Sequence, residues 1–154
     1  MDILKRNTDY ALRAMVKLAS QYENGPVSTR RMAQGEGIPY QLACKLMQKL
    51  HDSKLVESCM GPRGGFRLRR EPSKINVLQV IETIQGPIRL NRCLLGLDVC
   101  PRQKGCPVRP KLAQLQETIR AYLTGITLAE LAHTVRTAGK RPVKKVKEGA
   151  QNHR

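Results

Sequence analysis

The apolar residues in the first part of the chain recur at intervals of three and four. From Asp9 onward they line one broad face, which predicts a helix that ends near Gly25 and Pro26. The face consists of Tyr10, Leu12, Met15, Val16, Leu18 and Ala19. One side of this helix is therefore expected to enter the core.

Two shorter helices are predicted next. Ser28 is a suitable N-cap for a short helix that Gly35 and Gly37 are expected to end. Pro39 then begins a third helix, in which apolar residues recur every four positions at Leu42, Leu46 and Leu50. A short helix, a tight turn and a longer helix are typical of a helix-turn-helix.

The pattern changes to alternation between residues 55 and 70. Two runs rich in apolar residues flank the segment Gly61-Pro62-Arg63-Gly64-Gly65, which predicts a β-hairpin. In the returning run, Phe66 and Leu68 alternate with Arg67 and Arg69. Three helices followed by a hairpin are the order of a winged helix-turn-helix, so we predict a mainly α fold with a small β wing.

The remaining chain divides into three parts. The sequence NVLQVIETIQ predicts a fourth helix that ends at Gly86 and Pro87, and residues 1–86 are interpreted as the DNA-binding region. A cysteine-containing loop follows at 87–107, and residues 108–138 hold a long helix and a shorter one that begins at Thr127. Residues 139–154 are rich in lysine and arginine and predict a disordered tail.

Composition supports a nucleic-acid partner. The chain of 154 residues has a formal net charge of +16, which attracts a polyanion such as double-stranded DNA. There is no apolar run of membrane-spanning length and no export signal, so a cytoplasmic protein is expected. No set of nucleophile and base, phosphate loop or paired carboxylates indicates an enzyme.

Polar side chains of the third helix are candidates for DNA contacts. If Leu42, Leu46 and Leu50 face the core, the polar residues between them point outward, although any amphipathic helix has such a solvated face. A compact hairpin tip that carries an arginine is suited to a minor groove. The predicted DNA-binding residues are Ser28, Arg30, Arg31, Tyr40, Gln41, Cys44, Lys45, Gln48, Lys49, Pro62, Arg63, Gly64 and Arg67.

Three cysteines, Cys93, Cys100 and Cys106, lie within fourteen positions on the loop. Their spacing does not match the Cys-x-x-Cys pairs of structural zinc sites, yet thiolates on one loop suit zinc, copper(I) or an iron–sulfur cluster. A redox disulfide with one spare cysteine is a further reading. Cys44 and Cys59 are interpreted as packing residues, with Cys44 also a candidate for oxidation.

Together these features resemble the IscR/NsrR family of bacterial transcription regulators, which are dimeric winged-helix proteins. The matching pieces, in order over residues 1–137, include NTDYALRAMVKLA, GPRGGFRL, INVLQVIETIQGP, the three-cysteine loop and ITLAELA. The resemblance implies that Cys93, Cys100 and Cys106 hold an iron–sulfur cluster, typically 2Fe–2S. Some members that resemble this family work without a cluster.

The resemblance further implies a fourth cluster ligand. In IscR-like members a histidine follows the third cysteine by three positions, but here that position is Arg109, which cannot act as a ligand. In NsrR-like members an aspartate of the first helix completes the site from the partner subunit, and TDYALRA places Asp9 there. His51 and His133 are less favoured alternatives.

The expected function is that of a dimeric regulator, in the usual case a repressor, whose cluster controls its affinity for DNA. The signal would be nitric oxide, redox state, or the supply of iron or clusters. The long helix is predicted to pair with its twin in a second chain, although its apolar residues would equally suit an intrachain core. These residues are Leu112, Leu115, Ile119 and Leu123. The alternative is a cluster-free regulator that responds to a metabolite or a partner protein, or one with a zinc site.

Overall fold

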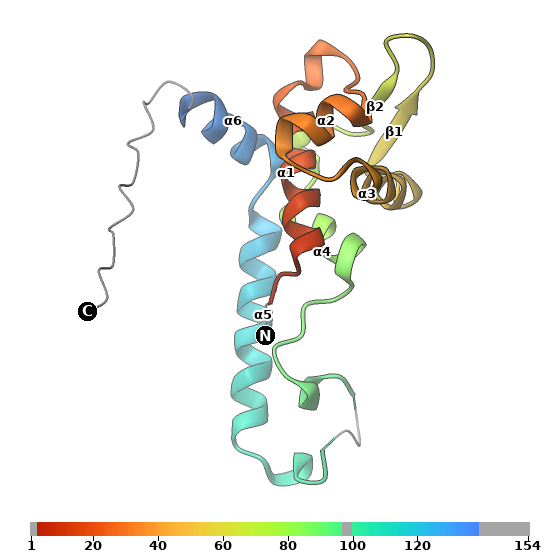
Figure 1. The fold of residues 1–154 in the computed structure, drawn as a ribbon. Coiled ribbons are helices and arrows are strands. Elements are labelled where there is room, and N and C mark those ends of the chain that lie inside the picture. Colours follow the sequence, from red (N-terminus) through yellow and green to blue (C-terminus); the bar gives the residue numbers. More distant parts are fainter. Residues whose placement is uncertain (1–2, 97–99, 139–154) are drawn as a thin grey trace, which may run out of the picture.

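A computed structural model describes residues 3–96 and 100–138 of the chain (Figure 1). The predicted tail at 139–154 lies outside the described residues. The fold is mainly helical with one two-stranded antiparallel hairpin, as predicted. The helices are α1 (Arg6–Ser20), α2 (Thr29–Glu36), α3 (Tyr40–Asp52), α4 (Val77–Gln85), α5 (Val108–Gly125) and α6 (Leu128–Ala138). The strands are β1 (Val56–Cys59) and β2 (Gly65–Leu68), and short 3-10 turns are η1 (Tyr22–Asn24), η2 (Pro72–Lys74), η3 (Arg92–Leu94) and η4 (Gln103–Gly105).

Helix α1 begins at Arg6, three residues before the predicted start at Asp9, and it ends at Ser20, before the predicted end near Gly25, because the chain continues as the 3-10 turn η1. The added turn is polar, so apolar spacing gave no sign of it. Asp9 therefore lies within the helix and caps nothing; its carboxylate accepts a hydrogen bond from Arg13, one turn later, at 2.6 Å. The predicted apolar face is present and is buried along most of its length.

The helix-turn-helix is formed by α2 and α3. Ser28 caps α2 as predicted, because its hydroxyl accepts a hydrogen bond from the backbone N–H of Arg31 at 3.3 Å. Gly35 lies inside α2 and does not end it, which corrects the prediction. The helix ends at Gly37, whose φ of 64° is the left-handed conformation that glycine adopts most readily.

The hairpin is tied to the helix-turn-helix through its second strand. In the register of the pair, Glu57 faces Arg67 and Cys59 faces Gly65. On the other edge of β2, Val27 exchanges two backbone hydrogen bonds of 2.9 Å with Phe66, directly before the cap of α2. The wing and the entry to α2 are thus joined through backbone hydrogen bonds.

Two apolar clusters hold the helices together. The larger one gathers side chains of α1, α2, α3, the hairpin and α6 around Met15, Met47 and Leu50. The second lies between α4 and the C-terminal helices and is centred on Ile81, with Ile88 also buried. The chain has no tryptophan and one phenylalanine, so methionine and aliphatic side chains fill this interior.

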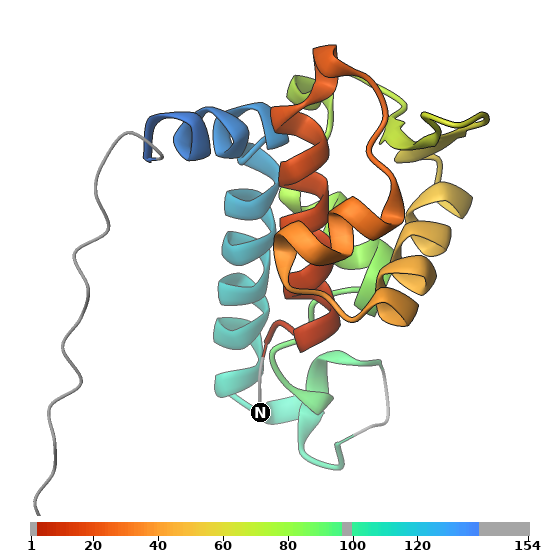
Figure 2. The same ribbon diagram turned by 45° about the horizontal axis from the view of Figure 1, so that its top comes forward.

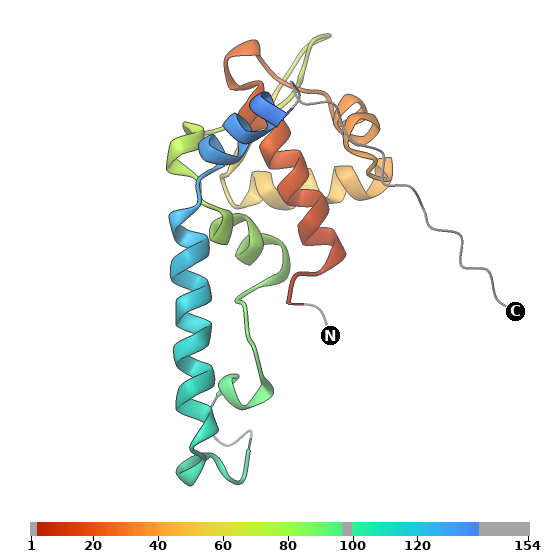
Figure 3. The ribbon, with the colours of Figure 1, turned by 90° about the vertical axis from the view of Figure 1, so that its left-hand side faces the viewer.

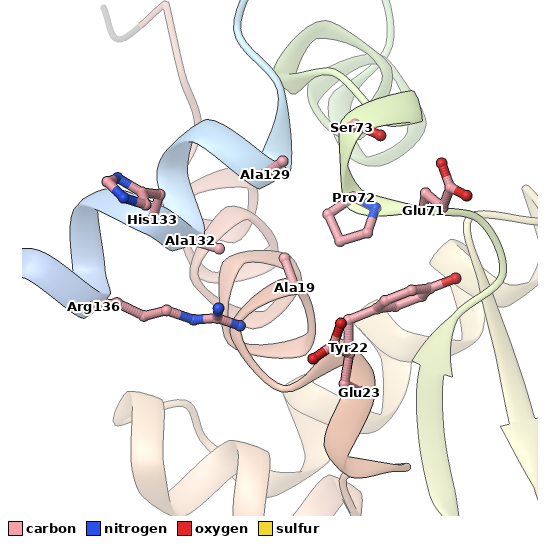
Figure 4. Close-up of a pocket in the computed structure, with 10 residues that line it drawn as sticks. All are labelled: Ala19, Tyr22, Glu23, Glu71, Pro72, Ser73, Ala129, Ala132, His133 and Arg136. Carbon is pink, nitrogen blue, oxygen red and sulfur yellow. The ribbon is translucent and has the colours of Figure 1, made fainter.

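Helices α5 and α6 connect the two ends of the molecule. Figures 1 and 3 show α5 running from the cysteine loop to the neighbourhood of α1, where α6 turns across it. Asn76 and Thr127 form an isolated antiparallel β-bridge. Its backbone hydrogen bonds join the starts of α4 and α6. Arg136 donates to the carbonyl of Ser20 at 2.8 Å, beside a cavity of about 500 Å³ lined by α1, η1, η2 and α6 (Figure 4).

Replacement of Gly65 by alanine should detach the wing from α2. A Cβ at this position would lie 2.3 Å from the carbonyl oxygen of Val27, and the φ of 155° is unfavourable for other residues. We expect Gly65→Ala to lower the free energy of unfolding by about 1–3 kcal/mol in urea denaturation. Gly35→Ala is the control: it meets nothing within 4 Å and should stabilise α2 by about 0.5–1 kcal/mol. Equal effects of the two substitutions would contradict the prediction.

Candidate DNA-binding surface and cysteine loop

Helix α3 has one buried and one exposed face. Ala43, Leu46, Met47 and Leu50 are buried, while Leu42 packs at the edge of the same cluster. The opposite face carries all of the α3 side chains that the sequence singles out for DNA, and all are exposed: Tyr40, Gln41, Cys44, Lys45, Gln48 and Lys49. The face is long enough and polar enough to enter a major groove.

Several of these side chains have partners within the chain. Gln48 donates a hydrogen bond to Asp52 at 2.8 Å, one turn further along α3. The guanidinium of Arg30, from α2, lies 5.8 Å from the ring centroid of Tyr40, which is a cation–π distance. In the part of the chain that the structure describes, Lys45 and Lys49 form no ion pair. Their charges are therefore available to phosphates.

The hairpin tip projects beside α3 (Figures 1 and 2). Pro62 and Arg63 are exposed. Gly64 closes the turn: a Cβ there would lie 2.3 Å from the carbonyl oxygen of Cys59, so only glycine fits. Lower on β2, Arg67 is hydrogen-bonded to Glu57 at 2.6 Å, which raises the pKa of its guanidinium above the ordinary value. Arg67 stays charged but is already paired, so a phosphate would have to compete with Glu57.

The cysteine loop lies at the opposite end of α5 from α6, away from the wing (Figures 1 and 3). Cys93 belongs to η3 and Cys106 directly follows η4. All three thiols of the loop are half-buried and none forms a disulfide. Polar contacts hold the loop to α5: Arg109 donates to the carbonyl of Cys93 at 3.2 Å, and the side chain of Gln116 accepts from the N–H of Leu90 at 3.2 Å.

The donor set suits a sulfur-bound metal centre in type but is not gathered around one point. Among residues 3–96 and 100–138, no three Cys, His, Asp or Glu side chains converge on a common metal position. Cys106 borders a cavity of about 470 Å³ that Arg102 and Lys104 also line, and both cations would offset an anionic group. The loop would have to draw its thiols together around such a group.

The remaining ligand candidates lie on different elements. Asp9 is exposed on α1 and paired with Arg13. His51 follows the last buried residue of α3 and is half-buried, with its ring 6.4 Å from that of Phe66. His133 lies on α6, at the far end of α5 from the loop (Figures 1 and 4). A ligand role for His133 within one chain is therefore unfavourable.

Several residues with structural roles near the loop escaped the sequence reasoning. Arg109, noted only as a missing ligand, supports the loop through its hydrogen bond to Cys93.

The apolar residues of α5 lie on two faces. Ile119 and Leu123 pack against the α4 cluster of the same chain, as the intrachain alternative foresaw. The exposed apolar stripe consists of Val108, Leu115 and Tyr122, which are 56%, 49% and 71% exposed and spaced by seven residues. Counting heptads along α5 would have found this stripe.

Comparison with known proteins identifies the family. Residues 4–134 match Rrf2, described as an iron-dependent transcriptional regulator. The chain belongs to the Rrf2 family of transcription regulators. The transcription regulator IscR of Yersinia pseudotuberculosis is 32% identical over 124 residues, which cover 80% of this chain and 75% of IscR.

Solved structures of Rrf2-type regulators share the fold. IscR of T. potens has a TM-score of 0.74 at 24% identity, over 91% of this chain and 93% of that one. CymR, the global cysteine regulator of B. subtilis, has a TM-score of 0.73 at 26% identity, over 87% and 98%. The winged-helix class is thus confirmed. The Yersinia relative is a transcription regulator. None of the described helices of this chain could cross a membrane.

Lys45→Ala and Arg63→Ala should each weaken DNA binding and its dependence on salt. Each removes one cation from the predicted surface, so the slope of log affinity against log salt should fall by about 1. The measurement is fluorescence anisotropy on a duplex that the protein itself retains from genomic fragments. Lys74→Ala is the matched control, because Lys74 lies in η2 beside α6 and its Nζ already pairs with a carboxylate oxygen of Glu71 at 3.4 Å. An unchanged salt slope in both variants would show that Lys45 and Arg63 do not contact phosphates.

Proposed function

We propose that this Rrf2 protein is a dimeric repressor whose affinity for double-stranded DNA is set by an iron–sulfur cluster, most simply 2Fe–2S. The observation that carries the proposal is the set of three unpaired, half-buried thiols on one loop that is fixed to the first turns of α5. The signal would be nitric oxide, redox state, or iron or cluster supply. The similarity to IscR supports this reading.

Cys93, Cys100 and Cys106 would hold the cluster, and Asp9 of a second copy would supply the fourth ligand. A bound cluster contributes reactivity toward nitric oxide and oxygen that protein side chains lack. Asp9 must leave Arg13 to serve as a ligand, and a carboxylate is a harder ligand than a thiolate. Both features make this fourth position the labile one, which suits a sensor.

The dimer would form along the exposed stripe of α5. In the described part of the chain, no side chain of α5 is fully buried, although the helix has eighteen residues. Ile119 and Leu123 cover α4 within the chain, which leaves Leu115 and Tyr122, together with Val108 and Leu112, for a second copy. Twofold pairing of α5 would space two recognition helices for two half-sites.

The loop can influence the DNA-binding surface through α4. Helix α4 ends directly before the loop and packs against α1, α3 and α5. A rearrangement of the loop therefore displaces an element that touches the recognition helix. A differential stability of about 3 kcal/mol between two arrangements changes a DNA-competent population by roughly two orders of magnitude.

A cluster-free regulator is the second candidate. It is favoured by the similarity to CymR and by the lack of a preassembled ligand set among the described residues. In that case the cavity of Figure 4, lined by Tyr22, Glu71 and Arg136 among others, would be a place for a metabolite. The two functions differ in whether the protein holds iron when it is purified without oxygen.

Substitution of any loop cysteine by serine should remove the iron. Protein purified anaerobically should be coloured and contain iron, and Cys93→Ser, Cys100→Ser and Cys106→Ser should each lower the iron content to near zero. Cys44→Ser and Cys59→Ser are matched controls that should retain it. The checks are iron analysis and the visible spectrum. Colourless, iron-free wild-type protein that binds its DNA normally would reject the cluster, and stoichiometric zinc would indicate a structural zinc site.

Leu115→Glu should separate the dimer. A carboxylate at the centre of the stripe would be buried without a partner, so the dimer dissociation constant should rise by about thirtyfold or more in analytical ultracentrifugation. Gln114→Glu adds the same charge on a neighbouring exposed position and should leave the dimer intact. Unchanged circular dichroism would show that the variant is folded. A Leu115→Glu protein that is as dimeric as the wild type would refute a dimer interface along the exposed stripe of α5.

A further inference from the structure

The side chain of Gln85 fixes the N-terminal segment of α1. Its Oε1 accepts hydrogen bonds from the N–H of Lys5 at 3.0 Å and from the hydroxyl of Thr8 at 2.6 Å. Its Nε2 donates to the carbonyl of Ile3 at 2.9 Å. One amide thus makes three hydrogen bonds to a segment about eighty residues away in sequence.

Thr8 makes this contact specific. It is fully buried, and it is the one polar side chain in the buried class among the described residues. A buried hydroxyl without a partner is costly, so the contact between Thr8 and Gln85 strongly favours one rotation of the first turn of α1. The backbone N–H of Lys5, just before that turn, depends on the same amide oxygen.

The position of Gln85 joins two parts of the candidate switch. It is the last residue of α4, and the loop begins two residues later, after Gly86. Thr8 directly precedes Asp9 on α1, and successive residues of a helix point about 100° apart. When Thr8 is held inward by Gln85, Asp9 points outward, where it now meets Arg13.

We propose that Gln85 is a positioning residue that couples the cysteine loop to α1 and sets the direction of Asp9. The inference rests on the proposed function, in which Asp9 is a cluster ligand. Displacement of the loop moves the end of α4, and the amide transmits this movement to the first turn of α1. Helix α1 contacts α2, α3 and β2, so the displacement reaches the DNA-binding surface.

The Gln85 amide acts both as an acceptor and as a donor of hydrogen bonds. Alanine at position 85 removes all three hydrogen bonds, whereas glutamate keeps the two acceptor contacts and loses the donation to Ile3. Thr8→Val keeps the shape of the side chain and removes only the hydroxyl. Gln79→Ala is the matched control, because Gln79 forms the capping box at the other end of α4 with Asn76.

The first test needs no cluster. Amide hydrogen exchange of cluster-free protein should show residues 8–10, the first hydrogen-bonded amides of α1, exchanging about tenfold faster in Gln85→Ala and Thr8→Val than in the wild type. Gln85→Glu should lie in between, and Gln79→Ala should leave this segment unchanged. Equal protection of residues 8–10 in all variants would show that Gln85 does not hold α1, and the proposal would be overturned.

The second test measures coupling. The ratio of DNA dissociation constants with and without an anaerobically reconstituted cluster should fall by about tenfold in Gln85→Ala, and stay at the wild-type value in Gln79→Ala. The iron content should remain that of the wild type, because no thiol is changed, but the cluster should be lost faster. If the wild-type protein switches and Gln85→Ala switches equally, the role of Gln85 is refuted and the proposed function stands. If the wild type does not switch, both fall.

Discussion

The close packing around α1 is the constraint on which the rest of the structure depends. Small side chains on its buried face, Ala11, Ala14 and Ala19, let neighbouring elements approach the helix backbone. Helices α2, α3, α4 and α6 and strand β2 all contact it. Because such an interior tolerates little change in volume, a displacement at one end of α1 cannot be absorbed locally. The helix is therefore a rigid connection between the candidate DNA-binding surface and the end that lies toward the cysteine loop.

The order of elements could be predicted from the sequence because it depends on local signals. Apolar spacing gave the helices, and Ser28, Gly37 and Gly86 marked ends that the structure confirms. The predictions failed where the signal was absent or ambiguous. The first turn of α1 is polar, and Gly35 is tolerated inside α2 at a small cost in stability. The backbone pairing of Val27 with Phe66 is a contact between distant residues, which no periodicity encodes.

The candidate site, too, could be predicted from the sequence only in part. The outward face of α3 follows from helix geometry once its apolar stripe is known, and its side chains are exposed as expected. The cysteine loop was visible from its three clustered cysteines, but its geometry was not, because its apolar residues follow no regular helix or strand spacing that would define one conformation. Polar groups of Arg109 and Gln116 hold it to α5, and Ile88 near its start is buried against α4. In such a loop, metal binding itself supplies much of the free energy that orders the ligands.

Charge alone could not account for the proposed control of DNA binding by the cysteine loop. The chain carries a formal net charge of +16, and the loop lies at the opposite end of α5 from α6, away from the wing, so gain or loss of one small anionic group there would be largely screened at the wing, because the Debye length in 0.1 M salt is about 10 Å. Non-specific affinity should therefore be similar in both states. In the proposed dimer, specific affinity would differ because two recognition helices must match half-sites about 34 Å apart, and a small rotation of each α3 would spoil both contacts together. A geometric coupling through α4 and α1 can act on this spacing, which long-range electrostatics cannot.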